Sequence, residues 1–357
     1  MQELKETIGK IEKIDFSRLK EVQKRLDNLT KPRGSLGRLE ELAKRIVCIT
    51  ENFHPEIKNK VVFVMAGDHG VTEENVSAYP QEVTLQMVYN FLRGGAGINV
   101  LAKHAGAQVI VVDMGVVSKL QIEKCKLQNF RDKKINYGTK NIARGPAMTK
   151  KEAIRSIEAG MEVFEEEFKR GVDIAGTGDM GIGNTTASSA IASVITAKPV
   201  EDVTGRGTGI DDETFSRKIA VIKKAISVNK PNASDAIDVL SKVGGFEIGG
   251  LAGIILASAS RRVPVVIDGF ISGAAALIAY CLKPEVKDYM IAAHCSVERG
   301  HKIVLDYLGL RPILDLNLRL GEGTGAALAM NIIEASIKIL TRMATFQSAS
   351  VSKKIDK

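Results

Sequence analysis

Between residues 60 and 70 the chain reads Lys60-Val61-Val62-Phe63-Val64-Met65-Ala66-Gly67-Asp68-His69-Gly70. A continuous apolar run of this length is typical of a parallel strand that is buried on both faces. Asp68 and His69 follow this run, at the carboxyl end of the strand, where open α/β sheets place their ligand contacts. The stretch therefore predicts a parallel sheet with a ligand site at its carboxyl edge.

The same pattern recurs along the chain, at residues 108–115, 172–175, 263–269 and 289–294. Segments with helical spacing separate these strands. Strands that alternate with helices form parallel sheets with helices on both faces. We therefore expect an α/β protein with a parallel, Rossmann-like sheet flanked by helices.

Composition and charge exclude several classes of protein. The 357 residues are 45% hydrophobic and 26% charged, which is the balance of a folded globular protein. The net charge of +8 comes from scattered basic residues, and only 5% of the residues are aromatic. We expect small anionic substrates rather than nucleic acid as partners. The apolar region 250–282 is interrupted by charged residues, so we expect no membrane segment.

Cysteine and histidine spacing predicts neither a disulfide framework nor a metal site. Cys48, Cys125, Cys281 and Cys295 show no paired C-x-x-C spacing, and the five histidines show no metal-ligand spacing. Residues 1–18 lack the apolar segment of a signal peptide. We therefore expect a cytoplasmic protein without a bound metal.

A single carboxylate stands out near the C-terminus, in Arg319-Leu320-Gly321-Glu322-Gly323-Thr324-Gly325. The apolar run 326–330 follows, so the two glycines around Glu322 fall at the start of a predicted helix. Backbone can approach a ligand closely there, and free N–H groups point outward. Glu322 is our first candidate for the chemistry; the alternative is a loop and helix cap without catalytic role.

A second glycine-rich stretch, residues 176–186, permits two interpretations. Gly176, Gly178 and Gly181 match the dinucleotide pattern G-x-G-x-x-G after a strand, with Glu201-Asp202 at a suitable distance for a ribose contact. The glycines continue to Gly183, however, and end in polar residues that would form an oxyanion cradle for a mononucleotide phosphate. Both a dinucleotide site and a mononucleotide site therefore stay open at this point.

Five motifs in the same order resemble one enzyme family: Lys31-Pro32-Arg33-Gly34-Ser35-Leu36-Gly37, Ala66-Gly67-Asp68-His69-Gly70-Val71, Gly181-Ile182-Gly183-Asn184-Thr185-Thr186, Gly205-Arg206-Gly207-Thr208-Gly209 and the stretch 319–325. The chain resembles nicotinate-nucleotide:5,6-dimethylbenzimidazole phosphoribosyltransferases over nearly its whole length.

The resemblance implies transfer of the 5-phosphoribosyl group from nicotinate mononucleotide to 5,6-dimethylbenzimidazole, giving α-ribazole 5′-phosphate and nicotinate. It implies a homodimer and no cofactor. It also implies a large α/β domain at residues 31–318 and a small helical domain built from residues 1–30 and 319–357, which include the catalytic loop.

The resemblance also assigns roles to residues of this chain. Glu322 is the general base. Gly181, Gly183, Asn184 and Thr185 hold the substrate phosphate, and Asp179 and Gly207 lie near the nicotinate and ribose. The base pocket is formed by Tyr79, Gln86, Met87 and Leu320.

The reaction itself calls for one carboxylate. A pyridinium leaves C1′ as a neutral pyridine, so its departure needs no general acid. The attacking benzimidazole becomes cationic unless it loses its other N–H, which a carboxylate within hydrogen-bond reach accepts. A helix start lowers the pKa of Glu322 and an apolar pocket raises it, so the sequence leaves the direction open. A dinucleotide-dependent oxidoreductase and a non-catalytic nucleotide sensor are the alternative functions, and the preferred acceptor base is also open.

Overall fold

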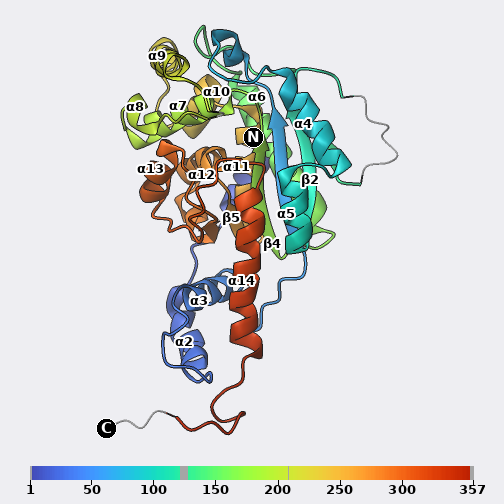
Figure 1. Ribbon diagram of the computed structural model, residues 1–357, viewed down its shortest axis with the longest axis vertical. Coiled ribbons are helices and arrows are strands. Elements are labelled where there is room, and N and C mark those ends of the chain that lie inside the picture. Colours follow the sequence, from blue (N-terminus) through green and yellow to red (C-terminus); the bar gives the residue numbers. More distant parts are fainter. Residues whose placement is uncertain (1, 121–127, 208, 354–357) are drawn as a thin grey trace.

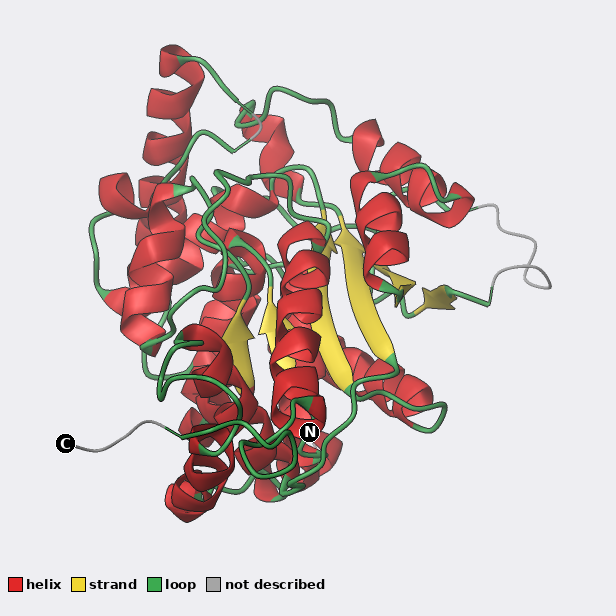
Figure 2. Ribbon diagram, turned by 60° about the horizontal axis from the view of Figure 1, so that its bottom comes forward, coloured by secondary structure: helices red, strands yellow, loops and turns green. Residues whose placement is uncertain are grey.

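A six-stranded, all-parallel sheet forms the centre of the computed structural model, which describes residues 2–120, 128–207 and 209–353. The strand order is β3-β2-β1-β4-β5-β6. Helices cover both faces of the sheet (Figure 2). The strands are β1 (Lys60–Gly67), β2 (Ala107–Gly115), β3 (Phe130–Asp132), β4 (Ile174–Met180), β5 (Val265–Ile267) and β6 (Met290–Ala292).

Strand β1 is buried along its entire length, as its apolar run predicts. Successive side chains of a strand point to opposite faces of the sheet. Phe63 and Met65 therefore enter one hydrophobic core, and Val62 and Val64 enter the other. Because both faces carry a core, the side chains on both faces are apolar from Val61 to Ala66, and the buried Lys60 at the start of the strand pairs with Glu334.

One core lies between the sheet and a large set of helices: α1 (Gln2–Gly9), α6 (Lys150–Phe168), α7 (Asn184–Thr196), α9 (Asp212–Asn229), α10 (Ala236–Val243), α11 (Phe246–Ser260), α12 (Phe270–Leu282) and α13 (Arg299–Leu308). The other core involves α2 (Leu19–Asp27), α3 (Arg38–Thr50), α4 (Glu82–Arg93), α5 (Gly97–Ala105) and α14 (Thr324–Arg342). Short elements connect them: η1 (Phe16–Arg18), η2 (Gly70–Glu74), α8 (Val200–Val203) and η3 (Pro284–Tyr289).

Residues 29–30 and residues 344–345 meet beyond the sheet. Helix α14 runs from the sheet toward α2 and α3, which lie beside its lower half (Figure 1). The Thr30 N–H donates to the Ala344 carbonyl at 3.0 Å, and Leu29 and Thr345 form an antiparallel bridge. Helix α1, in contrast, packs against α6 and α11. The division into domains at residues 30 and 318 stays a prediction.

Most elements form where the pattern of apolar residues predicts them. Two differences concern strands: β3 is not among the strands expected from sequence, and the strand expected at 172–175 runs instead from Ile174 to Met180. Its second half is Gly-Thr-Gly-Asp-Met, which has low strand propensity and pairs because β1 lies beside it. Helices α10 and α13 were not predicted.

Two sequence expectations concern the whole chain. Within the described residues, no helix is both long and apolar enough to span a bilayer. Cys48, Cys281 and Cys295 are free thiols, whereas Cys125 lies outside the described residues.

Helices α6 and α11 approach each other so closely that only glycine fits at their contact. A Cβ atom at Gly160 would overlap the backbone carbonyl of Gly250, and one at Gly253 would overlap the carbonyl of Ile157. Because α11 also packs on β1 and β4, this contact fixes the distance between α6 and the sheet.

We expect Gly160→Ala to lower the free energy of unfolding by about 3 kcal/mol, because backbone atoms rather than a flexible side chain would have to move. Gly9→Ala is the matched control, since a Cβ there has nothing within 4 Å; it should range from no change to a gain of about 1 kcal/mol. Urea unfolding measures both. Equal stability of the two variants would contradict the close-contact interpretation.

Candidate active site

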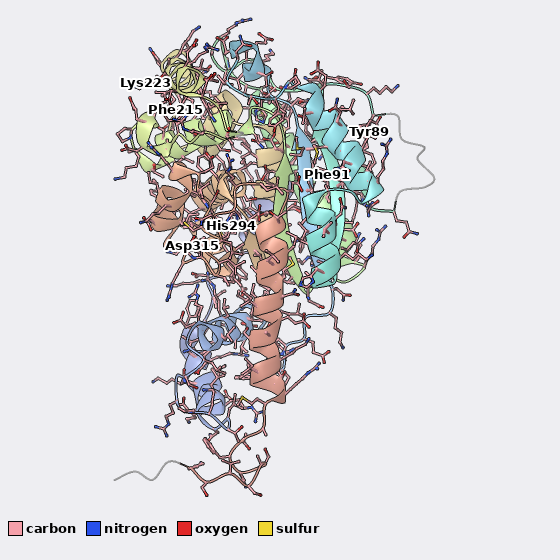
Figure 3. The ribbon with its side chains drawn as sticks, viewed as in Figure 1. Tyr89, Phe91, Phe215, Lys223, His294 and Asp315 are labelled. Atoms are coloured by element: carbon pink, nitrogen blue, oxygen red, sulfur yellow. The ribbon has the colours of Figure 1, made fainter. Side chains whose placement is uncertain are left out.

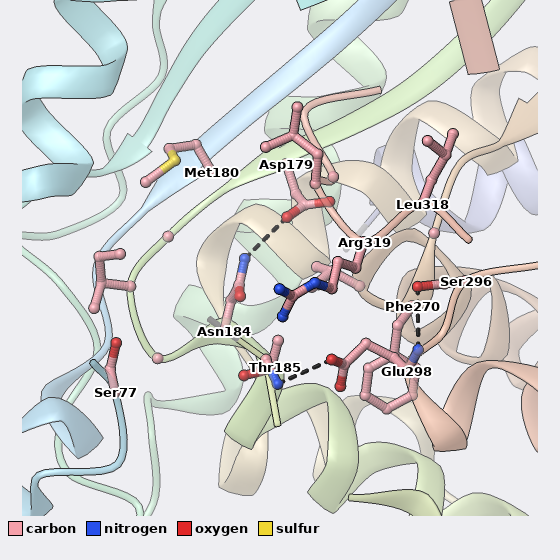
Figure 4. A pocket seen from close by; sticks show the side chains of 18 of the residues that line it. Ser77, Asp179, Met180, Asn184, Thr185, Phe270, Ser296, Glu298, Leu318 and Arg319 are labelled. Carbon is pink, nitrogen blue, oxygen red and sulfur yellow. Dashed lines mark hydrogen bonds between the residues drawn. The ribbon is translucent and has the colours of Figure 1, made fainter. Parts of the chain in front are cut away.

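The site lies where the sheet order reverses. Strand β1 pairs with β2 on one side and β4 on the other, and in open α/β sheets ligands bind outside the carboxyl ends of strands at such a point. A cavity of about 470 Å³ opens there. Its lining comes from the end of β4 and the turn after it, from the residues that follow β5 and β6, and from the segment 317–321 that leads into α14 (Figure 4).

One end of the cavity has the features of an anion cradle. Gly183 adopts a φ of 94° and precedes the first residue of α7, so Asn184 and Thr185 form the helix N-terminus. The Nζ of Lys218 donates to Thr185 Oγ1 at 2.7 Å, and Gly207 lies beside both. Helix N–H groups, a hydroxyl and an ammonium together suit a phosphate.

Lys218 was missed by the sequence analysis. It is buried, and that burial lowers its pKa to about 8, although the Glu298 carboxylate acts in the opposite direction. A signal was present: the buried positions of α9 are Lys218, Val221, Ile222, Ala225 and Asn229, so this lysine lies on the apolar stripe. A cation on the buried face of a helix requires a nearby anion or acceptor.

The carboxylate of Asp179 connects the cradle to the turn that carries Glu322. Asn184 Nδ2 donates to Asp179 Oδ2 at 3.0 Å, and a Cβ at Gly321 would lie 3.3 Å from the same oxygen (Figure 4). Burial raises the pKa of Asp179 well above its ordinary value, and the charges of Asp268 and Glu247 raise it further. Asp179 is therefore a group that holds a proton more readily than an exposed aspartate.

The turn before α14 has an unusual backbone. Gly321, Glu322 and Gly323 have φ values of 78°, 62° and 91°, a region that a non-glycine residue such as Glu322 rarely adopts. The turn lies directly on β4, where a Cβ at Gly178 would overlap the Glu322 carbonyl. Glycine at 178 thus permits the turn to reach the sheet.

Glu322 is buried and faces the N-terminus of α5. Its Oε2 accepts a hydrogen bond from the Ile98 N–H at 3.0 Å. Burial raises its pKa, the Ile98 N–H lowers it, and the charge of Asp268 raises it; the net direction is upward. The sequence left open whether the pKa of Glu322 is raised or lowered; in the structure it is raised. Among the described residues the cavity lining includes its neighbours Leu320 and Gly321 but not Glu322 itself.

The expected base pocket is only partly assembled around this cavity. Tyr79 and Leu320 line it and are more than half exposed. Gln86 is exposed on α4, and Met87 packs against the core beneath that helix; neither belongs to the described lining. The assignment of Gln86 and Met87 to the base pocket stays a prediction.

Further polar residues that the sequence analysis did not assign to the site line the cavity. Glu298 accepts a hydrogen bond from the Gly207 N–H at 2.9 Å and so holds the loop 205–209, of which Thr208 lies outside the described residues. Arg319 brings a second cation and lies between Asp179 and Glu298 (Figure 4). His294, which follows β6, also lines the cavity.

Asp68 and His69 connect the elements around the cavity and lie outside its described lining. His69 Nε2 and Glu247 Oε1 lie 2.7 Å apart with both side chains buried, which connects the end of β1 to the first turn of α11. Asp68 Oδ2 accepts from the Val117 N–H at 2.8 Å. Neither side chain is in the described lining of the cavity.

The dinucleotide interpretation of residues 176–181 fails on the position of its glycines. Gly176 and Gly178 lie inside β4 and not in a turn after it, and they leave room for the side chains of α14 and for the Glu322 turn. Glu201 and Asp202 lie in the short helix α8 rather than at the end of a neighbouring strand. The G-x-G-x-x-G match is therefore not a dinucleotide fingerprint.

Comparison with known proteins agrees with this geometry. A family model described as phosphoribosyltransferase matches residues 11–351. The chain belongs to this phosphoribosyltransferase family. The nicotinate-nucleotide–dimethylbenzimidazole phosphoribosyltransferase of Desulforudis audaxviator is 57% identical over 352 residues, 99% of each chain, and that of Geobacter sulfurreducens is 56% identical over 355 residues, 98% of each chain.

A solved structure shares the fold. The crystal structure of CobT from Thermus thermophilus matches with a TM-score of 0.90 and 44% identity, over 94% of this chain and 99% of that chain. These findings confirm the family, the α/β fold class and the transferase class predicted from sequence. The roles of single residues are not tested by them.

We expect Lys218→Met to weaken binding of a phosphate-bearing ligand at least tenfold, because the cradle loses its charge. Binding to the unmodified protein should weaken as pH rises through about 8, since Lys218 is cationic below its pKa and neutral above it. Isothermal titration with nicotinate mononucleotide measures both effects.

Lys223→Met is the control for this experiment. Lys223 lies on the same helix, at the periphery, where it pairs with Glu201 (Figure 3). Equal loss of affinity in both variants would show that overall charge, and not the cradle, is responsible.

Proposed function

We propose that this protein transfers the 5-phosphoribosyl group from nicotinate mononucleotide to 5,6-dimethylbenzimidazole, with α-ribazole 5′-phosphate and nicotinate as products. One observation carries the proposal: a single cavity joins an anion cradle at Thr185 and Lys218 to the Glu322 turn, through Asn184 and Asp179. The relatives named above support the choice of substrates.

The cradle binds the 5′-phosphate in this proposal. Gly181, Gly183, Asn184 and Thr185 provide backbone and side-chain donors, and Lys218 provides the charge. Asp179 and Gly207 lie next to the cradle, within the same cavity, and there they meet the ribose and nicotinate. Holding both substrates in one cavity lowers the entropic part of the barrier.

Glu322 accepts the proton in this proposal. The leaving nicotinate departs as a neutral pyridine, so one base suffices, and it acts on the N–H of the attacking benzimidazole. Burial strengthens Glu322 as a base because it raises the pKa of the carboxyl. Tyr79, Gln86, Met87 and Leu320 surround the acceptor base.

Three further points belong to the proposal. The protein acts as a homodimer in the cytoplasm. Its small helical domain comprises residues 1–30 and 319–357, of which 1 and 354–357 lie outside the described residues, and its large domain comprises residues 31–318. The hydrogen bond between Thr30 and Ala344 supports the grouping of these two segments, whereas α1 packs against α6 and α11 of the large domain.

The direct test is release of nicotinate from nicotinate mononucleotide by the purified protein, with and without 5,6-dimethylbenzimidazole. We expect release that depends on the base, together with a ribazole phosphate product. Binding of the nucleotide without release under any base would support a nucleotide sensor instead. Quenching of nicotinamide fluorescence on titration would support a dinucleotide enzyme.

We expect Glu322→Gln to lower kcat at least about 100-fold, as loss of a general base does. The fold should persist, because the amide retains an oxygen that accepts from the Ile98 N–H. Glu213→Gln, an exposed residue of α9 that pairs with Arg217, is the control and should keep full activity. Full activity of Glu322→Gln would refute the assigned base.

The pH dependence follows from the same residue. Glu322 accepts a proton only when ionised, so kcat should fall as pH decreases through its pKa. Since burial raises that pKa, the acid limb should lie above the ordinary range of a glutamate. The residual rate of Glu322→Gln should lack this limb; an unchanged limb in that variant would assign it to another group.

A further inference from the structure

We infer that Asp268 is a positioning residue that holds the Glu322 turn in its active shape; this inference rests on the proposed function. Asp268 follows β5 and is completely buried. Its Oδ1 accepts from the Ala326 N–H at 2.9 Å, and its Oδ2 accepts from the Gly323 N–H at 3.3 Å. Backbone N–H groups at this helix start lower the pKa of Asp268, although its burial raises it overall.

These N–H groups are the ones that the helix itself leaves without partners. A helix leaves its first N–H groups without carbonyl partners one turn earlier. At the start of α14 the Thr324 N–H bonds to the Gly321 carbonyl at 3.1 Å and the Ala327 N–H to the Gly323 carbonyl at 2.9 Å, whereas the N–H groups of Gly323 and Ala326 bond to Asp268. Gly323, the residue before the helix, has no side chain that could act as a cap. The carboxylate of Asp268 therefore provides from another strand the cap that the local sequence lacks.

The turn needs such a restraint because its backbone is strained. Three consecutive residues, Gly321 to Gly323, have positive φ, and the middle one is Glu322. A non-glycine residue in this region is strained and persists only where surrounding contacts fix it. The hydrogen bond from Gly323, adjacent to Glu322, is such a contact.

Asp268 is itself fixed to the centre of the sheet. Its N–H donates to Thr177 Oγ1 at 3.1 Å, and Thr177 Oγ1 donates to the Val266 carbonyl at 3.3 Å. These hydrogen bonds fix the backbone of Asp268 to β4 and β5. Because the capping residue is fixed to the sheet, the turn that it caps keeps a fixed position relative to the sheet.

His294 packs against both Asp268 and the first residues of α14. Its Nε2 lies 3.9 Å from Asp268 Oδ1, and its ring packs so closely on Gly325 that a Cβ there would overlap it. Figure 3 shows His294 next to the upper end of α14. The start of the helix is therefore enclosed between Asp268 and His294.

Asp268 acts through the turn and not on the substrate. It is absent from the described lining of the cavity, and the backbone of residues 323–326 shields its oxygens. A buried carboxylate near Asp179 and Glu322 is unfavourable by itself. It is retained at this position because a carboxylate accepts several N–H groups at once, whereas an amide offers one oxygen only.

The test is Asp268→Asn, in which an NH₂ group faces one of the helix N–H groups. We expect kcat to fall 10- to 100-fold while KM for nicotinate mononucleotide changes less than twofold, because the cradle is unaffected. Amide hydrogen exchange of residues 321–327 should become faster. Asp113→Asn is the matched control: Asp113 is equally buried and accepts from the Gly115 and Val116 N–H groups, but at the end of β2.

The outcomes separate the two proposals. Wild-type protein without base-dependent nicotinate release would remove the proposed function and this inference with it. An active wild type with unchanged kcat in Asp268→Asn would overturn the inference alone. Equal loss of kcat and nucleotide affinity, or equal loss in Asp113→Asn, would assign Asp268 a general structural role. Asp268→Ala, which places no donor against the helix, takes the place of the asparagine variant if that variant does not fold, and the same criteria apply.

Discussion

The close approach of the Glu322 turn to strand β4 is the constraint on which the active site depends. Glycine at 176 leaves room for α14 and glycine at 178 leaves room for the Glu322 carbonyl, so helix and turn lie directly on the sheet. A side chain at either position would lift the turn away from the cavity. The glycines that resemble a dinucleotide fingerprint thus serve packing between two segments about 145 residues apart in the chain.

The same contact concentrates charge in the interior. Asp179, Asp268 and Glu322 are all buried, and burial raises the pKa of each. Backbone N–H groups at the starts of α5 and α14 offset part of this cost, because they point their positive ends at Glu322 and Asp268. Lys218, also buried, provides the opposite charge beside Thr185. Helix N-termini therefore hold Glu322 and Asp268, whereas Asp179 accepts from the side chain of Asn184.

The arrangement also explains why the proposed functional residues come from several segments of the chain. Parallel strands place all their carboxyl ends at one edge of the sheet. Asp179 lies near the end of β4, Asp268 follows β5, and His294 follows β6. Glu322 lies in the segment that leads into α14. The strands fix the positions of the first three residues, and Asp268 holds the Glu322 turn through the Gly323 N–H.

The alternation of strands and helices and the parallel sheet could be predicted from the sequence, because they follow from apolar periodicity, and local motifs indicated a glycine-rich ligand loop and a candidate base. The family resemblance also pointed to Tyr79 and Leu320, which line the cavity. The folded structure was needed to place Gly176 and Gly178 inside a strand, to bring Lys218 to Thr185, and to show that the pKa of Glu322 is raised. The physical reason is the same in each case: burial, close backbone approach and hydrogen bonds between distant segments arise from the packing of elements against one another, and no local pattern of residues encodes them.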